Sequence, residues 1–215
     1  MIIGNRKTGL KRILPRGVFP INIKTINNLP KIKLFIEDTV NENIRDVCKQ
    51  LLTDAMTRKD AFRHGEVGYL IKVNDDSSIA ILYKAYGDYI HIPLSTMNSY
   101  KNIIKSCSLN DNIIFIHSHP NNSDFSFGDF SMLVNTDVLK SILAIGNRGR
   151  ICIMSKDYQN KSLYNNMLNN IVNEANKICK DKNNPDDVRH CRDYVFSNYL
   201  SRGIMNSILN IKMYN

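Results

Sequence analysis

The sequence lacks the long apolar runs and the cysteine pairs that would mark a membrane or secreted protein. None of its 215 residues lie in a run near the roughly 20 apolar residues that a transmembrane helix needs. Its start has no apolar segment of the kind found in secretory signals. The five cysteines include no Cys-x-x-Cys pair, which favours buried thiols over a disulfide framework. We therefore expect a cytoplasmic protein in a reducing compartment, with no membrane partner.

Acidic residues are absent from the first 34 positions, where eight basic residues occur: Arg6, Lys7, Lys11, Arg12, Arg16, Lys24, Lys31 and Lys33. The whole chain has 29 Lys+Arg and 20 Asp+Glu, so residues 35–215 hold 29 − 8 = 21 basic and 20 acidic groups. Three prolines and no sustained periodicity predict an extended basic arm over 1–40, with a short strand near 18–26. Such an arm can bind nucleic-acid phosphates. It has few aromatics for base stacking, and a solubilising or self-packing segment is the alternative.

The remaining residues have an ordinary globular composition, with 43% hydrophobic and 23% charged residues over the whole chain. Hydrophobic periodicity and turn residues predict helices at about 42–60, 97–106, 127–137, 161–180 and 186–209. They predict strands at 67–73, 79–83, 89–92, 112–117, 141–145 and 150–155, the last two forming a hairpin. This order indicates an α/β fold with a mixed β-sheet flanked by helices. We assign 41–158 to the core and 159–215 to a helical C-terminal extension, whose apolar residues pack on the sheet or on a homodimer partner.

One segment carries the residues of a metal site, IHSHPNNSDFSFGDF at 116–130. His117 and His119 lie two apart at the end of a predicted strand, so both imidazoles face the same side. Asp129 follows after a loop that can fold back, and it offers an oxygen ligand. Two imidazoles and a carboxylate leave the fourth tetrahedral position of Zn²⁺ open for water, as in catalytic zinc sites. Bound zinc lowers the pKa of that water to about 7.

A hydrolytic zinc site also needs a proton acceptor, and Glu66 is the candidate. It stands at the head of the first predicted strand, in GEVGYLI, where an acid gains nothing by packing. Gly68 follows it and allows a close approach at that point.

The combination of Glu66, the HSHP sequence and the Ser126–Asp129 pair resembles the JAMM motif of the JAB/MPN metallopeptidases, over about residues 42–155. The resemblance implies a three-layer, cytidine deaminase-like fold with one zinc ion per chain. His117, His119 and Asp129 would bind the metal, Glu66 would be the general base, and Ser126 would stabilise the tetrahedral intermediate. The implied activity is deubiquitinase-like: hydrolysis of a peptide or isopeptide bond after the C-terminal tail of a ubiquitin-like or small precursor protein.

The spacing departs from that family in one place, because six residues instead of seven separate His119 from Ser126. This shorter form is similar to variants in phage-encoded and prokaryotic proteins. An alternative function is a RadC-like or virion-associated module that binds nucleic acid or a protein partner through the basic arm.

Two residues of the motif, and the three histidines outside it, also have structural interpretations. Ser126 and Asp129 also fit a helix capping box, in which Asp129 would be a cap and not a ligand. His91 fits an exposed strand position, His64 an ordinary loop, and His190 a structural role.

Overall fold

A computed structural model describes residues 17–94, 97–157 and 160–215 of the chain. The elements, in chain order, are α1 (Ile23–Asn27), α2 (Asp38–Thr57), β1 (Val67–Val73), β2 (Ile79–Tyr86), α3 (Asn98–Ser106), β3 (Asn112–His119), α4 (Phe127–Asn135), β4 (Leu139–Gly146), β5 (Ile151–Ser155), α5 (Lys161–Ile178), α6 (Pro185–Ser201), the 3₁₀ helix η3 (Met205–Ser207) and β6 (Asn210–Tyr214).

The strands form one mixed sheet in the order β2-β1-β3-β4-β5-β6. β3 and β4 are parallel, and the other neighbouring pairs are antiparallel. β3 and β4 are joined through α4, as a parallel pair requires a crossover connection. The predicted α/β class, a mixed sheet flanked by helices, is confirmed, and so is the β4–β5 hairpin.

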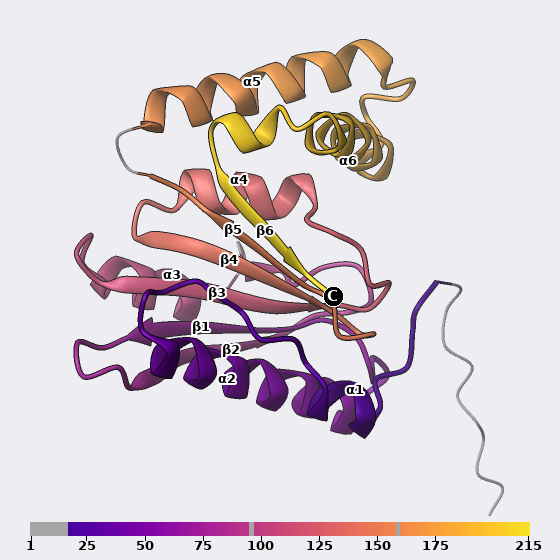
Figure 1. Ribbon diagram of the computed structural model, residues 1–215. Coiled ribbons are helices and arrows are strands. Elements are labelled where there is room, and N and C mark those ends of the chain that lie inside the picture. The colour runs from indigo at the N-terminus through magenta and orange to yellow at the C-terminus, as the bar shows by residue number, and fades with distance from the viewer. Residues whose placement is uncertain (1–16, 95–96, 158–159) are drawn as a thin grey trace, which may run out of the picture.

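Each face of the sheet is buried under helices, as Figure 1 shows. The side chains of β3 alternate between the two faces, as the two-residue period of a strand requires. Ile114 and Ile116 join the core beneath α1 and α2, whereas Ile113 and Phe115 join the core beneath α3 and α4. α5 and α6 pack against α4 and form a further layer on that side. His117 and His119, at the end of β3, lie on the same face as Ile113 and Phe115.

Residues 17–34 do not form the predicted extended arm. The strand predicted near 18–26 is wrong, because Asn22 caps a short helix by accepting a hydrogen bond from the Thr25 backbone N–H at 2.9 Å. Four apolar side chains of this segment are buried in the core: Ile21, Ile26, Leu29 and Ile32. Three of the eight basic residues, Lys24, Lys31 and Lys33, therefore belong to a packed segment. The other five lie in residues 1–16, outside the described residues.

The strand predicted at 89–92 is also wrong. The Asp88 carboxylate accepts hydrogen bonds from the backbone N–H groups of Ile90 at 2.6 Å and His91 at 2.9 Å. This local side-chain bonding bends the backbone and competes with strand pairing. His91 is exposed, as predicted, but it lies in a loop.

The helix predicted at 186–209 ends earlier, at Ser201, and the chain then returns to the sheet. Gly203 has a φ of +70°. Its backbone N–H donates to Leu200, and that of Ile204 donates to Tyr199. These two bonds form a Schellman motif, which terminates the helix. The C-terminal extension is therefore not wholly helical, because β6 pairs with β5 at the edge of the sheet.

All five cysteines are free thiols, and Cys48, Cys152 and Cys179 are buried. Among the described residues, no helix combines the length and apolar character that crossing a bilayer would require.

Candidate metal centre

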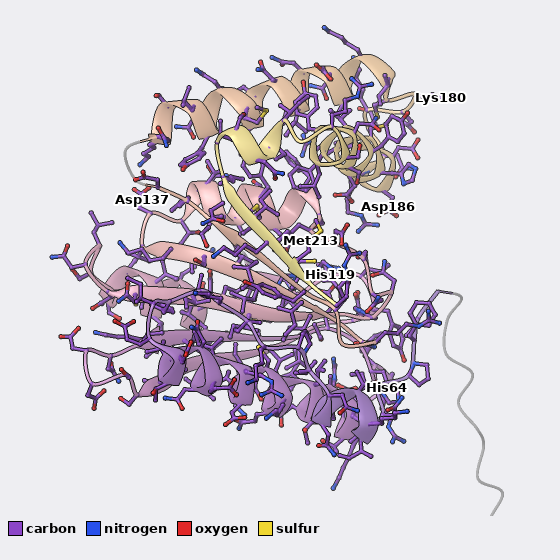
Figure 2. All side chains as sticks on the ribbon, in the orientation of Figure 1. His64, His119, Asp137, Lys180, Asp186 and Met213 are labelled. Carbon is purple, nitrogen blue, oxygen red and sulfur yellow. The ribbon has the colours of Figure 1, made fainter. Side chains whose placement is uncertain are left out.

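The end of β3 brings the two predicted histidines together. His117 and His119 lie on one face of the strand, as their spacing predicted, and their Nε2 atoms are 2.8 Å apart. Both side chains are buried, with exposed fractions of 3% and 5%. His117 stacks on Phe115, with ring centroids 5.4 Å apart. Figure 2 labels His119 at this end of the strands.

The first turn of α4 brings Asp129 to the same place. Its Oδ1 lies 3.0 Å from His117 Nε2, and its Oδ2 lies 3.5 Å from His119 Nε2. One ligand atom from each of the three residues lies within 4.8 Å of the others, so the group could hold a metal ion.

Asp129 also completes a capping box with Ser126. Asp129 Oδ2 accepts from the Ser126 backbone N–H and hydroxyl, both at 2.8 Å, and Ser126 Oγ accepts from the Asp129 N–H at 3.2 Å. From the sequence alone, cap and ligand are alternatives for Asp129. The structure shows that one carboxylate caps the helix and faces the imidazoles at the same time.

Pairing between β1 and β3 places Glu66 beside this group. Gly68 pairs with His117 at the end of the ladder, and Glu66 lies two residues before Gly68. The charges of His119 and Asp129 both act on the pKa of Glu66, so its carboxyl lies near them. The Val67 N–H donates to Ser118 Oγ at 2.9 Å, which holds the start of β1 against the end of β3. Glu66 is 8% exposed. Its backbone carbonyl accepts from Arg58 Nη1 at 3.0 Å.

The buried charges shift one another's pKa values. Burial raises the pKa of Glu66 to about 8, against the lowering effect of His119. Burial also raises the pKa of Asp129, but the charge of His117 and bonds to both imidazoles outweigh it, so the pKa lies well below the usual range. Burial lowers the pKa of His119. The bond to Asp129 and the charges of Asp129 and Glu66 together outweigh burial and raise this pKa to about 9. The site therefore contains one carboxylate that stays ionised and one that holds a proton readily.

Two imidazoles and a carboxylate are a donor set that could hold a metal ion. Ligand atoms about 2.0–2.1 Å from one tetrahedral Zn²⁺ would lie about 3.4 Å apart. The distance of 3.5 Å from His119 Nε2 to Asp129 Oδ2 is close to that value. The distances from His117 Nε2 to His119 Nε2, 2.8 Å, and to Asp129 Oδ1, 3.0 Å, are shorter. His119 Nδ1 lies 3.2 Å from the Ser123 carbonyl oxygen, which can only accept, so Nδ1 carries a proton and Nε2 is the nitrogen that faces the other two side chains of the group. His117 Nδ1 has no hydrogen-bond partner among the described residues.

Several residues that support the site were not predicted from the sequence. Ser118 and Ser123 lie inside the motif segment and are described above. For Asn147 the sequence predicted only a turn. It is fully buried, donates from Nδ2 to the carbonyls of Phe19 at 2.7 Å and His64 at 3.0 Å, and donates its backbone N–H to His119 at 3.1 Å.

His64, predicted as an ordinary loop residue, is buried with a φ of +66°. Its Nδ1 accepts from the Ile21 backbone N–H at 3.2 Å. Together with Asn147 it ties the N-terminal segment to the segment that carries Glu66. The short polar runs around these residues could indicate a turn, but not which distant backbone each side chain would meet.

Asp193 of α6 was also not predicted, and its Oδ1 accepts from the Phe127 backbone N–H at 2.9 Å. Burial, and to a smaller extent the charge of Asp129, raise the pKa of Asp193, against the lowering effect of the bond from Phe127.

Comparisons of the chain with protein-family models, with curated proteins and with solved structures find no match. The fold and the site define an α/β protein with a mixed sheet and a buried group of two histidines and one aspartate that could hold a metal ion.

Proposed function

We propose that the protein is a zinc-dependent hydrolase of the JAMM type, which cleaves peptide or isopeptide bonds. One observation carries this proposal: His117, His119 and Asp129 converge within 4.8 Å, and the buried Glu66 directly precedes β1, whose Gly68 pairs with His117. Two imidazoles and one carboxylate with a proton-accepting glutamate beside them are the groups that hydrolysis by this chemistry requires.

Zinc is the metal that this donor set favours, because neutral imidazole and carboxylate ligands in a three-residue set are typical of catalytic zinc sites. When bound, Zn²⁺ polarises the scissile carbonyl and acidifies water for attack. The described residues that would hold it are His117, through Nε2, His119, through Nε2, and Asp129, through its carboxylate.

Glu66 moves the proton in the proposed reaction. Its carboxylate takes a proton from the attacking water as the bond between the water oxygen and the carbonyl carbon forms. It then gives that proton to the leaving nitrogen as the carbon–nitrogen bond breaks. A carboxyl whose pKa burial raises to about 8 suits both steps near neutral pH, because it accepts and releases a proton with little free-energy difference.

Ser126 is assigned to the oxyanion of the tetrahedral intermediate. Its hydroxyl donates to Asp129 in this structure, so this role requires the hydroxyl to rotate toward the substrate. A lost contact of this kind costs roughly 3–4 kcal/mol of transition-state stabilisation in other hydrolases.

The proposed substrate is a ubiquitin-like or small precursor protein with an extended C-terminal tail. β2 forms one edge of the described sheet, next to the strand that Glu66 precedes. An extended tail could add to this edge through backbone hydrogen bonds, a common mode of peptide recognition.

The test is cleavage of a panel of ubiquitin-like proteins fused through their C-terminal tails to a small reporter. Wild type, Glu66→Gln and Glu37→Gln are compared, since Glu37 is exposed and lies before α2. We expect Glu66→Gln to lower the rate by about 10²–10⁴-fold, the usual contribution of a general base. Glu37→Gln should cleave like wild type. Equal cleavage by Glu66→Gln and wild type would show that Glu66 is not the base, and no cleavage of any fusion by wild type would count against the proposed substrate class.

A further inference from the structure

The position of Asp129 depends on the first turn of α4. Its carboxylate lies against two imidazoles while it caps the same turn. A helix start leaves N–H groups without partners inside the helix, and such turns fray unless those groups are satisfied. The Asp129 N–H bonds Ser126 Oγ, within the segment itself. The N–H of Phe127, the first residue of α4, is satisfied from outside, by Asp193.

The bond from Phe127 to Asp193 joins residues 66 positions apart in the sequence. Asp193 belongs to α6, which packs against α4, as Figure 1 shows. Three residues further along α6, Phe196 is fully buried and stacks on Phe130 of α4, with centroids 5.6 Å apart and ring planes 17° apart. Residues i and i+3 lie on the same face of a helix. The Phe196 contact therefore fixes the face of α6 that presents Asp193 to the start of α4.

A second acid near Asp129 is electrostatically unfavourable unless another interaction compensates for the repulsion. Asp193 and Asp129 repel each other, yet Asp193 is partly buried and directs its carboxylate to the Phe127 N–H. A negative charge at a helix N-terminus interacts favourably with the helix dipole, which offsets part of this cost.

We propose that Asp193 is a positioning residue of the metal site: it holds the N-terminal turn of α4 so that Asp129 meets His117 and His119. This inference rests on the metal site of the proposed function and extends that site to α6. The JAMM-like segment would then be incomplete as a metal site without the C-terminal part of the chain.

The test measures Zn²⁺ affinity of the full-length chain by competition with a chromophoric chelator. Asp193→Ala removes the acceptor, Asp193→Asn keeps an acceptor oxygen without the charge, and Ser197→Ala is an exposed control on the same helix. We expect Asp193→Ala to bind Zn²⁺ about 10–100-fold more weakly, as with other outer partners of metal ligands. Asp193→Asn should stay within about threefold of wild type, as should the control, because in both variants the hydrogen bond that orients the ligand is kept.

Thermal unfolding of the metal-free variants separates positioning from general stability. A purely structural Asp193 would lower the melting temperature in Asp193→Ala and leave the Zn²⁺ affinity of the folded protein unchanged, which would overturn the proposal. A tenfold loss in Asp193→Asn would also overturn it, because the hydrogen bond would then not be the cause. If Asp193→Ala does not fold, Asp193→Glu, which displaces the acceptor by one methylene, should show the weakened affinity, and wild-type affinity there would contradict the proposal.

The result is distinguishable from failure of the proposed function. Wild type that binds no Zn²⁺ removes both proposals. Wild type that binds Zn²⁺ without cleaving any fusion counts against the proposed substrate class and leaves Asp193 to be judged by affinity alone.

Discussion

The middle and the end of β3 are both buried, but they are built from opposite kinds of residue. Ile113–Ile116 are apolar and pack against helices on the two faces of the sheet. His117 and His119 continue the same strand with imidazoles that are nearly as buried as those apolar side chains. β1 repeats the contrast, with Leu70 and Ile71 in the core and Glu66 just before its first residue.

This difference shows which part of the strand stabilises the folded state. Burying the apolar side chains stabilises the fold through the hydrophobic effect. Burying the Glu66 carboxyl costs free energy that the charge of His119 only partly offsets, so its pKa is raised. Local conflicts of this kind are expected at functional sites, and the two ends should respond to mutation in opposite directions.

The largest effect on stability is expected in the apolar part. Ile114→Ala should destabilise the protein by about 2–5 kcal/mol, because it leaves a cavity in the core beneath α2. The same substitution at Ile90, which is 61% exposed, should change stability by about 0.5 kcal/mol or less. Chemical denaturation of the two variants checks this contrast. Similar losses at both positions would show that the described core does not carry the stability of the fold.

An effect of opposite sign, and of similar size at most, is expected at the polar end. In the metal-free protein, Glu66→Gln should increase stability by up to about 4 kcal/mol at pH 8, because the neutral amide does not have to ionise in a buried site. The gain should depend on pH. Glu66 has a folded-state pKa of about 8, above its ordinary value of 4.5, so its stability penalty is absent below about pH 4.5 and grows until about pH 8.

Denaturation of wild type and Glu66→Gln in the presence of a chelator, at several pH values from about 5 to about 8, measures this gain. The stability difference should rise with pH, with Glu37→Gln showing no such trend. A difference that is constant with pH, or that favours wild type at the upper end of this range, would mean that Glu66 ionises without strain and contributes to folding like an ordinary carboxylate.

The sequence predicted those features that depend on local periodicity. The alternation of β3 placed both histidines on one face, and the Ser126–Asp129 spacing predicted the capping box. The elements from α2 to α5 lie close to their predicted ranges, apart from the strand expected at 89–92. Each of these depends on residues close together in the chain, where spacing alone determines geometry.

The features that the sequence did not predict depend on contacts between distant segments or on backbone turns. β6 pairs with β5 after α6 ends near Gly203, which has a positive φ. One glycine in the sequence does not by itself show that a helix ends there. The bond from Phe127 to Asp193 and the bonds from Asn147 to Phe19 and His64 join segments whose meeting only the tertiary fold determines. The roles proposed for the basic residues before Gly17 remain a prediction from composition.

The zinc content of the purified full-length chain tests the central claim most directly. Wild type, His119→Ala and the exposed-histidine control His190→Ala are each loaded with Zn²⁺, dialysed and analysed for bound metal. We predict about one zinc per chain in wild type and in His190→Ala, and none in His119→Ala, since three ligands define the site. Wild type without zinc, or His119→Ala with as much zinc as wild type, would contradict the assignment of the metal centre.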